Sequence, residues 1–544
     1  MGKGEYTIKN IYSGGYSAFK PTALSSGNYP IQTGSLGMTT NPQNANILQE
    51  ISEKIASGVK HIEVEAISPE YLDSIPKQHL KEVNRLSKLT GVGVSVHGPV
   101  MDTAGFDRRS GGWSEVDREM AQKKVFQTLE RSQEIDPDGN ILVNFHSAEG
   151  IPASQYEMTK KGLEEKRIIA VNRESGRMAP LEKEERFYPG GKEGEIRREN
   201  YSPKEGLEIL NEGEWDNSIN QLFFNKERAD EILQKYKPLI QHLYEDIGTK
   251  YDIEDLPKDQ QEVFRRVRNV DIYLSDLHKQ VNSLFSKAYE FGGEYQKNKL
   301  KELSEQYVED LGLSEDQEEK GRYVDPFKKS IAMQNLLLAM KDSGTKDPEK
   351  RLTPRMYVPI EEFAMEKSSM TYGNAAFQAY KKFKDKSPVL VIENPPAGFA
   401  LSTGGDIAEI VKKSREQFVE AAKKDSEISV SETEARKQAE KLIGATWDVG
   451  HINMLRKFGY SEEDIVKESE KVAPFVKHVH LSDNFGFDHT ELPMGMGNVP
   501  LKEIMEKLGN KGYEASKIIE AAQWWTHFKS YPFQVSLESM GSPI

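Results

Sequence analysis

Short apolar runs that end in polar or glycine residues alternate with amphipathic stretches from residue 31 onward. A short apolar run bounded by turn residues is typical of a buried strand, and its alternation with helical periodicity is typical of strand–helix units around a parallel sheet. The runs that fit are 31–38, 61–66, 93–99, 141–147, 389–395, 444–451, 476–483 and 516–522. Eight such strands predict an α/β fold, the closed (β/α)₈ TIM barrel.

The fourth and fifth runs are separated by a long segment with a different pattern. Its stretches 225–247, 256–291 and 296–311 repeat apolar residues at helical spacing, and 170–205 is charged and glycine-rich, which predicts a loop. We therefore predict a mainly helical insertion after strand 4. The chain then divides into an amino-terminal extension (1–30), the first part of the barrel (31–150), the insertion (151–365) and the second part with the carboxyl-terminal tail (366–544).

An insertion at this point would emerge at the carboxyl face of the barrel, where barrel enzymes have their active sites. It is therefore placed to act as a lid or a specificity element. A surface helical hairpin through which the chain forms a homo-oligomer is the equal alternative.

Composition narrows the chemistry and the partners. The chain has no cysteine, a formal net charge of −14 and a pI near 5.5. A metal ion would therefore be held by His, Asp and Glu, because no thiolate is present. The acidic charge argues against a nucleic-acid partner, since phosphate binding relies on clustered Lys and Arg. With no apolar run of roughly 20 residues and no signal-peptide core, we expect a cytoplasmic protein without a membrane partner.

Ionisable residues stand at the carboxyl ends of the third to the eighth predicted strands. In chain order they are His97, His146, Glu393, Asp448 with His451 in the following turn, His480 and Glu520. The carboxyl ends of barrel strands meet at one rim, so these side chains would converge. Burying several unpaired carboxylates costs several kcal/mol each, and a divalent cation removes that cost. The pattern predicts a metal site at this rim, with His478 deeper in the barrel.

Six motifs in order along the chain resemble one known family. They are "SVHGP", "VNFHS", "VIENPPAG", "WDVGH", "HVHLSD" and "KIIEA". They are similar to those of the xylose-isomerase-like TIM-barrel superfamily, which includes sugar and sugar-phosphate isomerases and epimerases and endonuclease IV (AP endonuclease family 2). The resemblance covers about 31–150 and 366–525 and leaves the insertion unexplained.

In the isomerase and epimerase branch, the resemblance implies one divalent metal bound by Glu393, Asp448, His480 and Glu520. It also implies that Glu393 and Glu520 are catalytic and exchange a proton on opposite faces of a bound ketose. Glu538 competes with Glu520 for the last ligand position, and spacing after the "KGY" turn favours Glu520.

In the endonuclease IV branch, the resemblance implies a three-zinc cluster that adds His97, His146 and His451. The family has an Asp-x-His pair a few residues before a "GxG" loop. Counting back from Gly495, the first glycine of that loop here, the equivalent positions hold His489 and Glu491. His and Glu still suit a metal ion, although this departure weakens the transfer of the three-zinc site.

We predict a sugar or sugar-phosphate isomerase or epimerase that uses one to three Zn, Mn, Co or Mg ions. Asn394 and Asn453 would orient substrate hydroxyls, and Trp447 and Trp524 would form an apolar wall for the sugar ring. Two alternatives stay open: an endonuclease IV-like phosphodiesterase acting on abasic DNA, and a non-catalytic scaffold whose helices bind a partner and whose barrel retains a structural metal.

Overall fold

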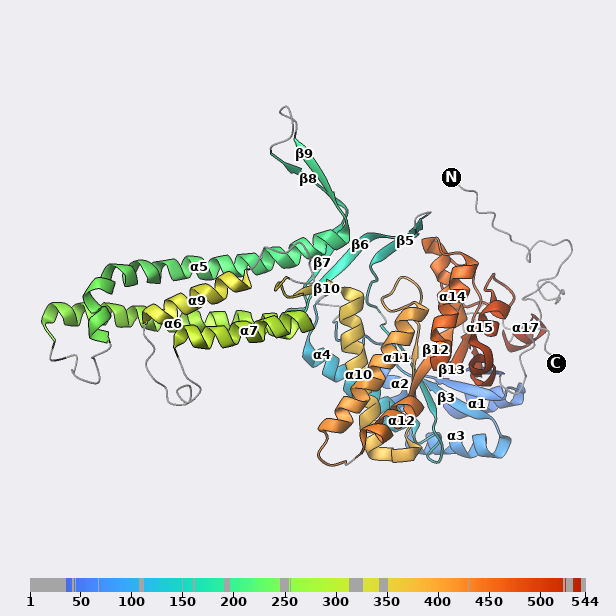
Figure 1. Cartoon of the computed structure of the whole chain (residues 1–544). Helices are drawn as coiled ribbons and strands as arrows, with labels where there is room; N and C mark the ends of the chain where they lie inside the picture. The colour runs from blue at the N-terminus through green and yellow to red at the C-terminus, as the bar shows by residue number, and fades with distance from the viewer. Residues whose placement is uncertain are drawn as a thin grey trace. The chain divides into compact units, whose positions relative to one another are not determined.

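The computed structural model describes residues 36–539 with internal gaps. The gaps are 42–43, 45, 67, 107–111, 149, 160–161, 190–195, 245–253, 255, 313–325, 342–350, 429, 522–523 and 525–531. The predicted amino-terminal extension 1–30 lies outside the described residues. The chain divides into two compact units (Figure 1). One unit is Lys183–Val358, and the other contains the chain on both sides of it.

Eight parallel strands close into a barrel in the order β1-β14-β13-β12-β11-β4-β3-β2. Their bounds are β1 Leu36–Thr39, β2 His61–Glu65, β3 Gly93–His97, β4 Leu142–His146, β11 Val389–Glu393, β12 Ile443–Asp448, β13 Val476–Leu481 and β14 Ser516–Ile519. Each strand lies within or overlaps one of the eight apolar runs. The predicted TIM barrel is therefore confirmed.

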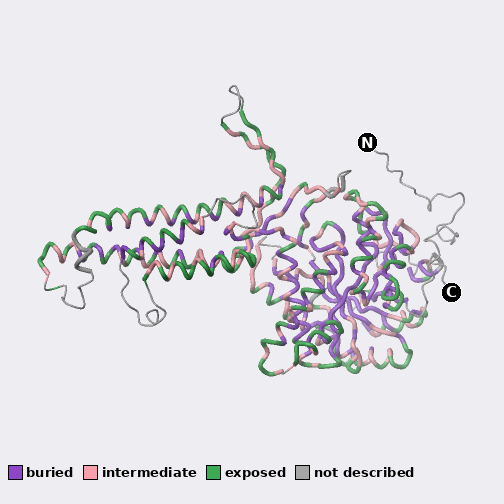
Figure 2. The backbone as a smooth tube through the Cα atoms, viewed as in Figure 1, coloured by how far each residue is buried: buried purple, intermediate pink, exposed green. Residues whose placement is uncertain are grey.

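Helices surround the barrel and bury its outer face, so the strands lie among the most buried parts of the tube in Figure 2. These helices are α1 Ile47–Ala56, α2 Pro69–Ser74, α3 Lys77–Thr90, α4 Glu115–Ser132, α10 Ile360–Phe383, α11 Gly404–Lys424, α12 Glu432–Leu442, α13 Val449–Asn453, α14 Glu462–Val472, α15 Leu501–Glu514 and α17 Pro532–Ser539. Helix α10 packs against both α4 and α11. It is therefore the barrel helix that follows strand β4, and it begins at Ile360, earlier than the sequence indicated.

Strands and long helices lie between β4 and α10 along the chain. They are β5 Gln155–Thr159, β6 Gly162–Asn172, β7 Met178–Glu182, β8 Glu184–Tyr188, β9 Arg197–Tyr201, α5 Pro203–Tyr244, α6 Lys258–Phe291, α7 Glu294–Leu311, α9 Pro326–Met340 and β10 Tyr357–Pro359. The helices have their own apolar core, which includes Trp215, Leu274 and Leu337. Among the described helices, none combines the length and apolar character that crossing a membrane requires.

The segment 170–205 is not a loop as predicted, because it contains the end of β6 and strands β7 to β9. Strands β8 and β9 form an antiparallel pair whose side chains are charged or aromatic on both faces, apart from the polar Asn200. Arg186 lies 5.1 Å from the ring of Tyr201, and Arg198 lies 3.9 Å from Glu185. Such a two-stranded ribbon has no apolar face, so its strands lack the alternation that would reveal them in the sequence.

Candidate metal centre

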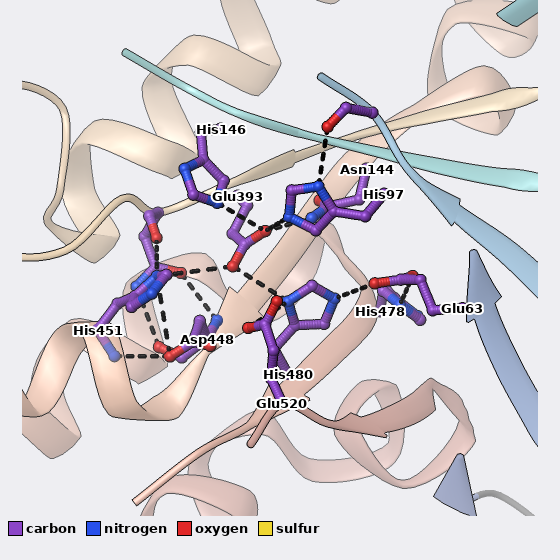
Figure 3. Close-up of polar contacts among 12 residues, drawn as sticks. Glu63, His97, Asn144, His146, Glu393, Asp448, His451, His478, His480 and Glu520 are labelled. Carbon is purple, nitrogen blue, oxygen red and sulfur yellow. Dashed lines mark hydrogen bonds and ion pairs between the residues drawn. The ribbon is translucent and has the colours of Figure 1, made fainter. Parts of the chain in front are cut away.

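Four side chains from neighbouring strands converge at the carboxyl end of the barrel (Figure 3). Glu393 ends β11, Asp448 ends β12, His480 lies near the end of β13, and Glu520 directly follows β14. One ligand atom from each lies within 4.8 Å of the others. His480 is central, because its Nδ1 is 3.1 Å from Glu393 Oε1 and 3.2 Å from Glu520 Oε2. Glu538, the predicted alternative to Glu520, lies in α17 (Pro532–Ser539).

Parallel pairing and strand alternation place these groups at one level. Asp448 pairs in register with His480, and Glu393 pairs with His146. Because side chains alternate between the two faces of a strand, the residues next to these point the other way, into the layer of helices. The register therefore converts separate sequence motifs into one cluster.

The chemistry of the four groups fits a divalent cation. The side chains of Glu393 and Asp448 are fully buried, and that of Glu520 is 13 % exposed. Asp448 Oδ2 is buried and has no hydrogen-bond partner among the described residues. Three carboxylates and one imidazole in this space are the oxygen and nitrogen donors that Zn²⁺ or Mn²⁺ accepts. A cation would give the orphaned oxygen a partner.

The pKa shifts also reflect the excess of carboxylates over positive charge in this cluster. Burial, reinforced by the charges of Glu520 and Glu393, raises the pKa of Asp448 well above its usual range. Burial alone would also raise the pKa of Glu520, but the neighbouring His480 outweighs it and lowers the value to about 2. The carboxylates around one imidazole therefore cannot all be ionised at low cost unless further positive charge is present.

Two more histidines hold the second oxygen of Glu393. The Nε2 atoms of His97 and His146 each lie 3.5 Å from Glu393 Oε2, and the Asn144 amide donates a hydrogen bond to the same oxygen. Burial opposes ionisation of Glu393, yet His480 and His146 lower its pKa well below the usual range. Glu393 is therefore held as a carboxylate from two sides.

The loop pair His489 and Glu491 reaches the same centre. His489 Nε2 lies 2.8 Å from His451 Nε2 and 3.4 Å from Glu491 Oε1. Burial and then the His489 charge lower the pKa of His451 to about 3. Burial and then the charges of Glu520 and Glu393 raise the pKa of Glu491 to about 8. The structure thus brings all nine predicted metal-site residues to one region of the rim.

Asp483 anchors this loop, a role that the sequence analysis did not assign. Its carboxylate accepts hydrogen bonds from the backbone N–H groups of Asn484 at 2.9 Å, Gly495 at 2.8 Å and Val499 at 3.1 Å. A Cβ atom on Gly497 would lie 2.3 Å from Asp483 Oδ1, so a side chain there would disturb this arrangement. The "SD" that follows strand β13 and the "GMG" turn were the signals in the sequence.

A pocket of about 610 Å³ opens above the cluster, a size typical of small-molecule sites. The residues that line it include Glu65, His97, His146, Phe399, His451, Lys457, Asp488, His489, Glu491 and Glu520. Glu65, Phe399 and Lys457 were not among the predicted site residues. For Glu65 the signal was its inward position in "HIEVEA", two residues after Glu63 on the same strand face.

None of the four predicted substrate-binding residues lines this pocket. The Trp447 side chain is fully buried, and its indole N–H donates to Ser469 Oγ at 3.0 Å. It precedes Asp448 on the strand, so alternation turns it outward towards α14. Trp524 is buried, with 6 % exposure. Neither ring is among the residues that line the pocket, and their role in a sugar-binding wall stays a prediction.

The two asparagines are buried structural residues. Asn394 Nδ2 donates to the Asp448 carbonyl oxygen at 3.0 Å, and its Oδ1 accepts from the Asp448 N–H at 2.8 Å. Asn453 Nδ2 donates to Asn484 Oδ1 at 3.0 Å and to Asn498 Oδ1 at 2.9 Å. Asn394 therefore aligns a candidate ligand strand, and Asn453 ties α13 to the loop that follows β13; neither is among the residues that line the pocket.

Comparison with known proteins supports the resemblance seen in the motifs. A family model described as xylose isomerase-like TIM barrel matches residues 374–526, a range that contains the four converging side chains. An uncharacterised protein of Methanocaldococcus jannaschii is 34 % identical over 80 residues, which are 15 % of this chain and 26 % of that protein. The chain therefore spans about a quarter of that relative's length.

Similar solved structures include two described as epimerases or epimerase-like. A D-tagatose 3-epimerase-like protein is 12 % identical, with 90 % of this chain and 91 % of that chain covered and a TM-score of 0.34. The D-psicose 3-epimerase of Clostridium cellulolyticum H10 is 8 % identical, with 93 % and 96 % covered and a TM-score of 0.39. The predicted resemblance to the xylose isomerase-like TIM barrels is confirmed by the family model over residues 374–526.

Proposed function

We propose that this chain, with its xylose isomerase-like TIM barrel, is a divalent-metal-dependent isomerase or epimerase of a sugar or sugar phosphate. One observation carries the proposal: Glu393, Asp448, His480 and Glu520 bring their ligand atoms within 4.8 Å of one another at the carboxyl end of the barrel. The resemblance assigns its single metal to these same four positions. The barrel's chemistry would therefore be that of a one-metal centre with two glutamates.

Both glutamates lie next to Nδ1 of His480 and would act as the proton-transfer pair. A bound divalent cation would polarise the carbonyl and hydroxyl oxygens of a ketose, which makes the neighbouring C–H acidic enough to lose its proton near neutral pH. Glu520, which borders the pocket, would take that proton as a carboxylate. Glu393, which His97, His146 and Asn144 hold as a carboxylate, would first take up a proton from a substrate hydroxyl or water and then return it to the opposite face.

The pocket lining suits a hydroxyl-rich substrate. Glu65 and Glu491 offer carboxyl groups to hydroxyls, and His489 offers an imidazole. Lys457 adds a cation beside Asp488 at the same pocket, which would serve a phosphate or a distal hydroxyl. Phe399 supplies an apolar surface in the place that Trp447 was expected to take.

The test is metal-restored turnover on a panel of ketoses and ketose phosphates in D₂O. Chelator-treated protein should convert at least one substrate after Mn²⁺, Co²⁺ or Mg²⁺ is added, with deuterium appearing at the carbon beside the carbonyl. Glu520→Gln should lower the rate about 10²–10⁴-fold, the range that a general base contributes, while the cation stays bound through the remaining ligands. Metal-loaded protein that exchanges no C–H deuterium across the whole panel would contradict the proposal.

A phosphodiesterase of the endonuclease IV type is the second candidate, and one observation favours it. His97, His146, His451, His489 and Glu491 all border the same pocket, so donors for more than one ion are at hand. Elemental analysis separates the two functions. One ion per chain is expected for the isomerase, whereas three ions together with cleavage of an abasic-site duplex would favour the phosphodiesterase.

A further inference from the structure

Glu63 lies on β2, deeper in the barrel than the four candidate ligands, and its side chain is fully buried. We propose that Glu63 is a positioning residue that fixes the tautomer and ring orientation of His480, so that Nδ1 of His480 faces the cation. This inference rests on the proposed function, because it concerns how the same metal centre is prepared. Glu63, which belongs to the first part of the barrel, would act on this centre through His480 and not as a further ligand.

The contacts place the His480 ring between two sets of carboxylates. On its deep side, His480 Nε2 lies 2.9 Å from Glu63 Oε1. On its rim side, His480 Nδ1 lies 3.1 Å from Glu393 and 3.2 Å from Glu520. Figure 3 shows Glu63 and the rim carboxylates on opposite sides of this ring. The two nitrogens of His480 therefore have different and fixed surroundings.

Glu63 is itself held by two further donors. Ser95 Oγ donates to Glu63 Oε2 at 2.6 Å, and His478 Nε2 lies 2.8 Å from the same oxygen. Both Ser95 and His478 are fully buried. With Oε2 occupied in this way, Oε1 is left to face His480. This explains the position of His478, which the sequence placed in the barrel interior without a partner.

The chemistry of imidazole makes this arrangement decisive for metal binding. A neutral imidazole carries one N–H and one lone pair, and a carboxylate can only accept. When a cation takes the lone pair of Nδ1, the proton lies on Nε2, which faces Glu63 Oε1 at 2.9 Å. The other tautomer would turn an N–H towards the cation and a lone pair towards a carboxylate. Such carboxylate partners of ligand histidines also raise the basicity of the ligand.

Glu63, His478 and His480 also bring three donor atoms together, so they form a second candidate group for a metal ion. Glu63 Oε2 already lies 2.8 Å from His478 Nε2 in hydrogen-bond geometry, which argues against an ion at that oxygen. His480 Nε2 lies 2.9 Å from Glu63 Oε1 as an ion-pair contact, and neither atom has a hydrogen-bond partner among the described residues. Ser95 already donates to one of the same oxygens.

The experiment is calorimetric titration of Mn²⁺ into chelator-treated protein, with Glu63→Gln as the main variant. The Gln amide cannot accept at both positions, so one of the three donors loses its partner. We expect Mn²⁺ affinity to fall about 10–100-fold, as is typical when the partner of a ligand histidine is lost. The visible absorption band of the Co²⁺-loaded protein should also change, because the ligand field at Nδ1 changes. A merely structural role would leave that band unaltered.

Two matched variants accompany it. Ser95→Ala removes one donor to Glu63 without altering a histidine, and should weaken Mn²⁺ binding in the same direction by a smaller factor. Asp406→Asn alters a partly buried carboxyl, which caps α11 by accepting from Thr403 Oγ1 at 2.7 Å. It should lower the Tm and leave Mn²⁺ affinity unchanged.

The possible results distinguish a failure of the proposed role of Glu63 from a failure of the proposed function. Glu63→Gln with wild-type Mn²⁺ affinity and an unaltered Co²⁺ band would overturn the role of Glu63 and leave the proposed function intact. Wild-type protein that binds no divalent cation would overturn the metal-dependent function itself. If Glu63→Gln does not fold, Ser95→Ala decides, because unchanged affinity and an unchanged Co²⁺ band in that variant also overturn the inference.

Discussion

The barrel rim and the helical unit 183–358 contain the same kinds of charged residue in opposite surroundings. In the helical unit, many acids and bases pair at the surface along one helix, as Arg266 does with Glu262 at 2.8 Å, although Lys226 is buried beside Asp230. At the rim, Glu393 and Asp448 are fully buried and face other ionisable groups. Exposed pairs contribute at most about 1 kcal/mol, whereas buried charges cost several kcal/mol unless they are compensated. Burial of charge, more than its amount, therefore indicates the site.

The surroundings of two histidines, one from each region, show this difference. His278 of α6 is partly buried, and its Nδ1 lies 2.7 Å from the Tyr307 hydroxyl, with the two rings stacked. His480 is fully buried and lies between Glu63, Glu393 and Glu520. The first is an ordinary packed residue with a neutral partner. The second is surrounded by negative charge on both edges, which is the setting of a ligand.

The largest expected effect is that of His480→Gln, with His278→Gln as its matched control. His480→Gln should reduce turnover about 10³-fold or more, because a ligand that supports several kcal/mol of charge stabilisation is lost. His278→Gln should leave kcat and metal content unchanged. Steady-state kinetics and elemental analysis of the two variants measure this. Equal effects of the two substitutions would show that burial among carboxylates does not distinguish the site.

A smaller effect is expected from opening a cavity in the helical unit. Leu274 is fully buried in its core, and Leu274→Ala should lower the unfolding free energy of that unit by about 2–5 kcal/mol. Mn²⁺ affinity should not change, since every proposed ligand belongs to the barrel unit. Thermal unfolding followed by circular dichroism, with calorimetric metal titration, tests both statements. A loss of Mn²⁺ affinity would show that the two units are energetically coupled.

The smallest effect concerns a buried cation at the other end of a barrel strand. Lys517 of β14 donates to the carbonyl oxygens of Tyr513 and Ala515, and burial lowers its pKa to about 8. Between pH 8 and about 10.5 the unfolded chain binds more protons than the folded chain at this residue, so stability should rise with pH in this window. Allowing for partial solvent screening, we expect a gain of about 1–2 kcal/mol.

Urea unfolding at pH 8 and pH 10 should show this rise in unfolding free energy in the wild type. The rise should be absent in Lys517→Met. Lys279→Met in the exposed surface of α6, where the side chain is 77 % exposed, is the matched control. It should keep the same pH dependence as the wild type. If Lys517→Met showed the same pH dependence of the unfolding free energy as the wild type, that dependence would arise from other groups.

The sequence predicted the barrel well because its strands are buried on both faces. All five residues of β11 are buried, and such a strand is visible as an uninterrupted apolar run. The candidate ligands followed from the same runs, since each stands at or near the end of a run. The hairpin of β8 and β9 could not be found in this way, because a charged ribbon without a buried face leaves no periodic signal.

Side-chain direction was harder to predict than side-chain position. Trp447 and Asp448 are adjacent, so only one of them can point into the barrel, and strand alternation alone would have turned Trp447 outward. Other roles needed the folded chain. The sequence shows that Glu63 and Glu65 face inward, but it cannot show that Glu63 contacts His478 and His480 while Glu65 borders the pocket.

The contact between Glu63 and His478 joins residues that are 415 positions apart. Contacts of such long range form late in folding, because the intervening chain must first be brought together. The buried side of His480 is therefore complete only when β2 has joined β13 through the closed barrel. A cation that depends on this histidine would bind the finished barrel and not its separate halves. Metal uptake during refolding would thus report barrel closure.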